Sequence, residues 1–313
     1  MQLPVSKPLV MITGPTAVGK TQLSLEIVGS LNGEIISADS RLFYKELDIG
    51  TAKPSRNERK VVQHHLIDIA DPDETLSLSV FQQSVYSICE KLWGEKKVPF
   101  LVGGTGQFIR AIMEGWVIPP QYPNKEMRGI LELWGREIGP ENLHDKLRLL
   151  DPKAAEKMDA RNLRRIIRAL EVILSTGKMF SDQRKKQKLG FKFKVIGLTR
   201  DREELYQRVD ERIVQMFENG FVDEVRALLD QGYHPELPAL SAIGYKEVID
   251  YLQGNILMDE VVLLMKRRTR SYIRRQANWF KLKDERIKWF EMHDGVGQEV
   301  LDYIISKDGW KNG

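Results

Sequence analysis

The sequence predicts an α/β fold in which helices cover a parallel β-sheet and a helical insertion interrupts it. Five short apolar runs alternate with stretches of helical periodicity, which is typical of a parallel sheet covered on both faces. Roughly 90 residues separate the third run from the fourth, far more than one crossover helix requires. The five predicted strands are residues 9–13, 34–37, 98–103, 194–198 and 286–292.

The long interval between the third and fourth strands predicts a separate helical region. It begins with a segment rich in Pro and aromatic residues, 115–123, and continues with helical patterns at 126–135, 143–150 and 162–175. We therefore expect a helical insertion over residues 116–192. The sheet would be built from a first part, 1–115, and a second part, 193–313.

The second part ends in a long amphipathic pattern, from about residue 259 to residue 281, that predicts a helix. Arg267, Arg270 and Arg274 share one face of it, whereas Met265, Tyr272 and Trp279 recur at seven-residue steps on another. We expect the arginine face to be an exposed basic stripe.

Composition excludes several classes of protein. The chain has 313 residues, 42% of them hydrophobic, but lacks the run of about 18 apolar residues that a membrane span needs. We also expect no secretion signal, since no charged segment followed by an apolar one opens the chain. Cys89 is the only cysteine, which excludes an intrachain disulfide and a thiolate zinc cluster. These features predict a cytoplasmic protein that does not contact membranes.

The positive charge is concentrated in two segments. Residues 160–194 hold eleven Lys and Arg against two acidic residues, and residues 266–288 hold ten against two, although the whole chain carries only +4. Basic segments on an otherwise acidic chain favour a polyanionic partner larger than a nucleotide, such as a nucleic acid. The alternative is a pair of solvated helix faces.

A phosphate-binding loop is the most informative feature of the chain. It follows the first predicted strand, precedes a predicted helix over residues 22–31, and matches G-x-x-x-x-G-K-[ST]. Its backbone N–H groups and the helix N-terminus would bind phosphate oxygens, and the Lys20 ammonium and Thr21 hydroxyl suit phosphate and Mg²⁺. We therefore expect a P-loop NTPase-like fold. The loop residues are Gly14, Pro15, Thr16, Ala17, Val18, Gly19, Lys20 and Thr21.

Three further features follow predicted strands, where ligands bind in open α/β sheets. Asp39 follows the second strand and is a candidate metal ligand or general base, with a helix N-cap as the alternative. The turn at 103–106, which contains three glycines and Thr105, allows a ligand to approach closely, although a tight turn explains the glycines nearly as well. Arg208, on a helix after the fourth strand, is a candidate clamp for an anionic leaving group, with a surface ion pair equally favoured.

Adjacent histidines, His64 and His65, superficially suggest a metal site. In an extended segment they point to opposite sides and do not easily chelate one ion, so we favour a structural role. The following Leu66-Ile67-Asp68 is too short to be a convincing Walker B strand.

These motifs, taken in order, resemble the tRNA dimethylallyltransferases, also called tRNA isopentenyltransferases, over nearly the whole chain. The run Asp-Ile-Gly-Thr-Ala-Lys-Pro at 48–54 is far more specific than the P-loop. The other motifs are Asp39-Ser40 with Tyr44, the run 64–68, the turn 103–106, Arg165 with residues 168–171, the run 242–247, and Arg275-Gln276 before Trp279-Phe280.

The resemblance implies transfer of a dimethylallyl group from dimethylallyl diphosphate to N6 of adenine 37, beside the tRNA anticodon, with Mg²⁺ on Thr21. Asp39 would act as the base, Lys20 and Arg208 would stabilise the diphosphate, and Thr16 would contact either a phosphate or Asp39. The whole P-loop would bind diphosphate, and we expect a monomer. The residues implied to contact the anticodon stem-loop are Asp39, Ser40, Arg41, Leu42, Thr105, Arg128, Arg164, Arg165, Ile166, Ile167 and Arg168.

Two other functions remain open at this point. A P-loop nucleoside or small-molecule kinase would explain the loop and the sheet but does not require the basic insertion. An RNA-binding NTPase switch would explain the charge and the loop together.

Overall fold

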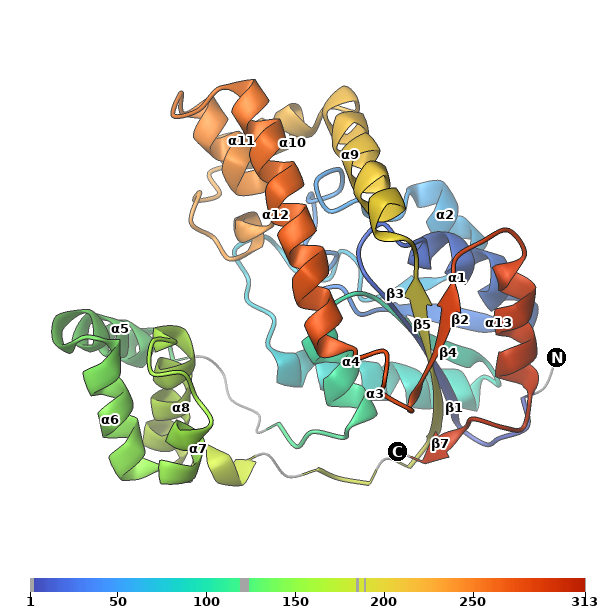
Figure 1. Cartoon of the computed structure of the whole chain (residues 1–313), viewed down its shortest axis with the longest axis horizontal. Helices are drawn as coiled ribbons and strands as arrows, with labels where there is room; N and C mark the ends of the chain where they lie inside the picture. The colour runs from blue at the N-terminus through green and yellow to red at the C-terminus, as the bar shows by residue number, and fades with distance from the viewer. Residues whose placement is uncertain (1–2, 119–123, 184–185, 189, 313) are drawn as a thin grey trace. The chain divides into compact units, whose positions relative to one another are not determined.

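The computed structural model describes residues 3–118, 124–183, 186–188 and 190–312 (Figure 1). The chain divides into two compact units. The first consists of residues 1–76, 81–113 and 189–313, and the second of residues 77–80 and 114–188. The insertion expected at 116–192 covers most of the second unit. Within the segment 115–123 that was expected to open it, residues 119–123 lie outside the described residues.

The first unit is built on one sheet with the strand order β3-β2-β4-β1-β5-β6, in which all neighbours run parallel. All five predicted strands are present, as β1, β2, β4, β5 and β6. The two that were not predicted, β3 and β7, have two residues each and are too short to show a pattern; β7 pairs antiparallel with β5. The strands are β1 (Pro8–Thr13), β2 (Gly33–Ser37), β3 (His64–His65), β4 (Val98–Val102), β5 (Lys192–Thr199), β6 (Ile287–Glu291) and β7 (Lys311–Asn312).

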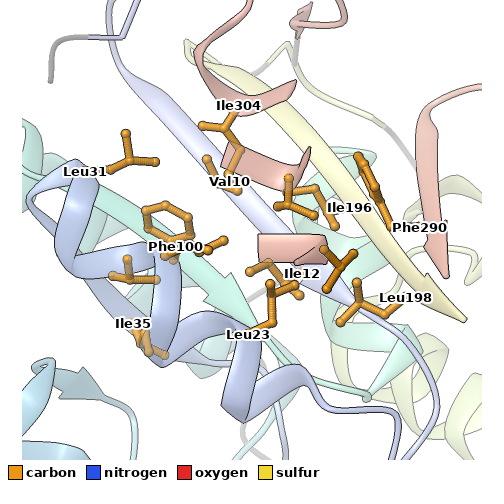
Figure 2. Packing of buried hydrophobic residues seen from close by; sticks show 14 of the residues in the cluster. Val10, Ile12, Leu23, Leu31, Ile35, Phe100, Ile196, Leu198, Phe290 and Ile304 are labelled. Carbon is orange, nitrogen blue, oxygen red and sulfur yellow. The ribbon is translucent and has the colours of Figure 1, made fainter. Parts of the chain in front are cut away.

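The central strand β1 is buried on both faces, as its continuous apolar run predicts. Val10 and Ile12 point to one face, where they meet side chains of the helices α1 (Lys20–Val28) and α13 (Val296–Ile305). Figure 2 shows Leu23 and Ile304 among this cluster, together with Phe100 from β4. Successive residues of a strand alternate in direction, so Leu9 and Met11 point to the opposite face, and both are fully buried there.

A second apolar cluster joins four helices to the loop that follows β2. It includes Val209, Phe221, Tyr245 and Met265 from these helices and Leu47 from the loop. The four helices are α9 (Arg202–Glu218), α10 (Phe221–Asp230), α11 (Tyr245–Leu252) and α12 (Met258–Trp279). α12 is the long C-terminal helix predicted over about 259–281. The remaining helices of the fold before the insertion are α2 (Arg56–Val61), α3 (Leu78–Gly94) and α4 (Gly106–Met113).

The second unit is a small helical bundle with its own core. Its helices are α5 (Lys125–Ile138), α6 (Pro140–Leu150), α7 (Pro152–Glu156) and α8 (Leu163–Thr176). Asn124, Asp151 and Asn162 cap the N-termini of α5, α7 and α8 through their side-chain oxygens. The sequence predicted α5, α6 and α8 but not the five-residue α7, which is too short for a periodic pattern.

Candidate active site

The phosphate-binding loop connects β1 to α1, as the motif predicts. Gly19 has φ 112°, a conformation that favours glycine, and it directly precedes α1. Lys20 folds over its own loop, because its ammonium donates hydrogen bonds to the carbonyl oxygens of Gly14 (3.0 Å) and Pro15 (2.7 Å). Burial lowers the pKa of Lys20 to about 8, and the nearby Asp39 carboxylate partly opposes this shift. The Lys20 ammonium therefore loses its proton more readily than that of an exposed lysine.

Two arginines of α9 reach the same loop region. Arg208 donates from Nε to the carbonyl oxygen of Ala17 in the phosphate-binding loop (3.0 Å). Arg212, one turn later, donates to the carbonyl oxygen of Thr51 (3.3 Å) in the loop at 48–54. Burial lowers the pKa of Arg212 from its ordinary value, while the Asp39 carboxylate acts in the opposite direction. The backbone contact of Arg208 differs from the surface ion pair considered as its alternative, and Arg212 is a cation that the sequence reasoning did not assign to the site.

Asp39 lies two residues after the end of β2, beside Lys20 and Arg212. Its Oδ1 accepts a hydrogen bond from the backbone N–H of Arg41 (3.0 Å). The next residue, Ser40, donates its backbone N–H to the Thr105 hydroxyl (3.2 Å), which links the end of β2 to the turn after β4. The carboxyl ends of two parallel strands thus bring Asp39 and Thr105 together.

The glycines of the turn at 103–106 are explained by close packing within the protein. A Cβ atom at Gly103 would collide with the backbone of Ala38, and one at Gly106 would collide with the Trp279 ring. Close packing against Ala38 and Trp279 accounts for these two glycines, a reason that differs from both the ligand approach and the tight turn suggested by the sequence.

Two cavities meet at this edge of the sheet. The first, about 670 Å³, is lined by the P-loop residues Lys20 and Thr21 and by Arg208. The second, about 430 Å³, has apolar walls that include Ile213 and Met265. Both cavities are lined by Thr16, Asp39, Thr51 and Arg212. An anionic group in the first and an apolar or aromatic group in the second would therefore meet beside Asp39.

The long helix α12 contributes side chains that were not predicted as site residues. Tyr272, Arg275, Gln276 and Trp279 line the smaller cavity. Burial, with a smaller contribution from the Asp39 carboxylate, raises the pKa of Tyr272 to about 12, so its phenol stays protonated. The seven-residue spacing of Met265, Tyr272 and Trp279 could have indicated these site residues from the sequence, because all three side chains line this cavity.

The basic stripe expected on α12 is only partly free for a ligand. Arg267 and Arg274 are exposed, but Arg270 forms an ion pair with Asp210 of α9 (2.8 Å). That arginine therefore joins two helices of the first unit.

The residues expected to contact RNA fall into distinct environments. Arg164 and Arg165 are exposed on α8. Arg128 and Arg168 both pair with the buried Glu171 carboxylate at 2.9 Å, so part of their charge is compensated within the bundle. Arg41 donates to the carbonyl oxygens of Pro238 and Ala239 and to the Ser241 hydroxyl, and Leu42 lines the larger cavity.

Two of these residues require a correction. Ile166 and Ile167 are 0% and 3% exposed in the core of the helical unit, so their side chains stabilise the bundle and present no surface to RNA. They lie on the apolar face of α8, opposite the arginines that share the same short motif.

The two histidines have structural partners. His65 Nε2 lies 2.6 Å from a Glu34 carboxylate oxygen, and His64 Nδ1 lies 2.7 Å from the Val62 carbonyl oxygen. Asp68, which follows them, pairs with Lys53 (2.5 Å) and Arg59 (2.6 Å). Within residues 3–118, 124–183, 186–188 and 190–312, no three His, Cys, Asp or Glu side chains are grouped so that they could hold a metal ion. None of the helices in this part of the chain is long and apolar enough to cross a membrane.

A parallel sheet with a phosphate loop between β1 and α1, and polar side chains at the carboxyl ends of β2 and β4, defines a protein of the P-loop NTPase-like class. A family model described as IPP transferase matches residues 42–283. The chain belongs to this family.

The similar proteins and structures agree with this assignment. The tRNA dimethylallyltransferase of Thermomicrobium roseum is 41% identical over 286 residues, which is 91% of this chain and 87% of that protein. The one of Carboxydothermus hydrogenoformans is 42% identical and covers 98% of this chain and 99% of its own length.

Two solved structures are also similar. The full-length tRNA isopentenylpyrophosphate transferase of Bacillus halodurans has a TM-score of 0.70 and 39% identity, covering 95% of both chains. A eukaryotic dimethylallyltransferase acting on tRNA has a TM-score of 0.77 and 28% identity, covering 92% of this chain and 75% of its own.

Proposed function

We propose that this protein transfers the dimethylallyl group of dimethylallyl diphosphate to N6 of adenine 37 in tRNA, next to the anticodon. The observation that carries the proposal is the meeting of the two cavities at Asp39, one lined by the phosphate loop and the other by apolar and aromatic side chains. Membership of the IPP transferase family and the names of the relatives support a transferase over the kinase and the NTPase switch.

The diphosphate would lie in the larger cavity. Lys20, the loop N–H groups and the two arginines of α9 would stabilise the negative charge that grows on it as the allylic carbon–oxygen bond breaks. Arg208 and Arg212 reach this cavity from one helix face, so they would approach the leaving group from the same side. The bond that breaks is carbon–oxygen, and the diphosphate leaves intact.

The adenine would enter the smaller cavity from a loop of RNA. Bases of a single-stranded loop can be extracted and stacked against aromatic side chains, here Tyr272 and Trp279, at an unstacking cost of a few kcal/mol. As the nitrogen–carbon bond forms, the Asp39 carboxylate would accept the proton that N6 loses. This step makes N6-isopentenyladenosine and leaves diphosphate in the P-loop.

The donor set of the larger cavity fits Mg²⁺. Thr21 is exposed at the start of α1 and lines the cavity together with Glu211, and both side chains carry oxygen atoms. Mg²⁺ prefers such oxygen ligands and usually keeps water and substrate phosphates as its other ligands. When bound, the ion would neutralise charge on the leaving diphosphate.

The exposed arginines of α8, Arg164 and Arg165, would contact RNA, and so, separately, would the segment around Asp39. We also expect the enzyme to act as a monomer in the cytoplasm, where tRNA is found and a lone cysteine such as Cys89 remains reduced.

The direct test is mass analysis of unmodified tRNA after incubation with the protein, Mg²⁺ and dimethylallyl diphosphate. We expect addition of one five-carbon group at adenosine 37, and no addition to a tRNA with another base at that position. A phosphorylated nucleoside formed from ATP, or RNA-stimulated ATP hydrolysis without prenylation, would contradict the proposal.

A further inference from the structure

The side chain of Gln276 connects two loops of the active site. Its Oε1 accepts a hydrogen bond from the backbone N–H of Thr16 (2.9 Å), and its Nε2 donates one to the carbonyl oxygen of Gly104 (3.0 Å). Gln276 belongs to α12 and is only 5% exposed. The amide therefore makes two specific hydrogen bonds to backbone groups that lie 88 positions apart in the sequence.

The two loops lie near different groups of the proposed reaction, one near the diphosphate and the other near the base. The loop of Thr16 also carries Lys20, which faces the diphosphate cavity. The turn of Gly104 also carries Thr105, whose hydroxyl accepts the N–H of Ser40 beside Asp39. The loop of Thr16 would therefore bind the leaving diphosphate, and the turn of Gly104 would support the base that receives the N6 proton.

We propose that Gln276 is a positioning residue that sets the distance between the allylic diphosphate and the attacking adenine nitrogen. The inference rests on the proposed function and adds to it a determinant of the reaction geometry. Gln276 acts through the backbone at Thr16 and Gly104 and does not itself take part in the bond changes.

Only an amide of this length satisfies both loops. Thr16 offers an N–H and Gly104 a carbonyl, so the linking group needs one acceptor and one donor. A glutamate would present a second acceptor to the Gly104 carbonyl, and an asparagine is one methylene too short to reach both groups. The contact also favours glycine at position 104, because a Cβ there would lie 2.4 Å from the Gln276 amide nitrogen.

The expected consequence is a slower chemical step with little change in substrate binding. A displacement of about 1 Å between reacting groups can lower a rate by about 10²-fold. We expect Gln276→Met, which keeps the chain length, and Gln276→Glu to lower the single-turnover transfer rate by roughly 10–100-fold. The KM values for dimethylallyl diphosphate and tRNA should stay within about threefold of the wild type, because the loops themselves remain.

A matched control separates positioning from a general effect on the core. Gln82 of α3 is also a buried glutamine, 6% exposed, and donates from Nε2 to the Ala111 carbonyl oxygen (3.1 Å). Gln82→Met should reduce the thermal unfolding temperature by a similar amount, but leave the transfer rate within about twofold of the wild type at a temperature where the protein is folded. If Gln276→Met does not fold, Gln276→Asn, which is the smaller change, is measured in its place, and the same loss in transfer rate is expected.

A loss of about fivefold or more in the transfer rate of folded Gln276 variants, with KM values kept, supports the inference. A smaller loss, a loss confined to KM, or an equal loss in Gln82→Met overturns it. If the wild-type protein does not prenylate tRNA, the proposed function itself fails; if the wild type is active and the variants match it, only the role of Gln276 fails.

Discussion

Asp39 lies beside two cations, Lys20 and Arg212, and this position underlies its proposed role. The Asp39 charge opposes the lowering of the pKa that burial causes in both Lys20 and Arg212. Asp39 lines both cavities, so its carboxylate is within reach of groups bound in either one. One of its oxygens accepts the Arg41 N–H, which fixes its orientation toward the cavities.

We expect Asp39→Ala to lower kcat by roughly 10²–10⁴-fold, the usual contribution of acid–base catalysis. Binding of dimethylallyl diphosphate, measured by calorimetry, should be largely kept, since removing a negative charge does not weaken an anion site. Asp39→Asn provides the matched control because it keeps the size but not the basicity. Turnover close to that of the wild type in either variant would remove Asp39 from the role of base.

The lowered pKa of Lys20 predicts a proton linkage. With a pKa of about 8 in the free protein, Lys20 is charged at pH 7 and largely neutral at pH 9. A bound diphosphate favours the charged form, so binding at pH 9 should take up a proton and the Kd should increase as the pH rises through about 8. Calorimetry in buffers of different ionisation enthalpy measures this uptake.

Lys20→Arg is the control for this linkage, because a guanidinium stays protonated throughout the range. It should abolish the difference in proton uptake between pH 7 and pH 9, apart from the protons that the ligand itself exchanges. Equal uptake by Lys20→Arg and the wild type would contradict the assignment to Lys20.

At the scale of single elements, the loop at 48–54 depends on one carboxylate of α10. Glu224 accepts hydrogen bonds from the backbone N–H groups of Asp48 (2.9 Å), Ile49 (2.6 Å) and Gly50 (3.2 Å), and from the Tyr245 hydroxyl (2.6 Å). Glu224 therefore holds residues 48–50 in place, and the residue that follows them, Thr51, accepts a hydrogen bond from Arg212. The most specific motif of the sequence therefore supports the position of Arg212, an arginine of the proposed diphosphate site.

Glu224→Gln should loosen this loop, because an amide has one acceptor oxygen and turns an NH₂ toward backbone donors. We expect a loss of about 1–3 kcal/mol in the free energy of unfolding, the usual cost of an unsatisfied buried donor. The KM for dimethylallyl diphosphate should rise more than the KM for tRNA. Denaturant unfolding and steady-state kinetics measure the two effects, and Glu285→Gln, at an exposed position, should change neither.

For the whole molecule, the concentration of positive charge on the helical unit predicts strongly salt-dependent RNA binding. Contacts between arginine and phosphate release counterions, so affinity falls linearly with salt on a logarithmic scale. Replacing both exposed arginines, Arg164→Gln and Arg165→Gln, should reduce the slope by about one for each lost contact. Binding of a fluorescent anticodon stem-loop at several salt concentrations measures the slope.

Arg226→Gln serves as the control for this experiment. Arg226 lies on α10, outside both basic segments, and pairs with Asp223. Its replacement should leave the slope unchanged, and a slope that is equal in all three proteins would mean that α8 does not contact the RNA backbone.

The strands and the phosphate loop could be predicted because their signals are local. β1 is a continuous apolar run, and the loop needs glycine where φ is positive, as at Gly19. Asp39 could be placed near the loop because parallel strands end at one edge of the sheet. The short elements β3, β7 and α7 could not be predicted, since two to five residues carry no periodic pattern.

Local pattern alone determined the class of fold, the phosphate site and the candidate base of this protein. The tertiary structure decided which distant side chains lie near these features. It places Arg212 and Gln276 at the candidate site and Glu224 against the loop at 48–54. It also places Ile166 and Ile167 in the core of the helical unit rather than on its surface. The physical reason is that hydrogen bonds and ion pairs depend on distances of about 3 Å in space, which the packing of helices establishes. Thr16 and Gln276 are 260 residues apart, and no local sequence pattern indicates the hydrogen bond between them.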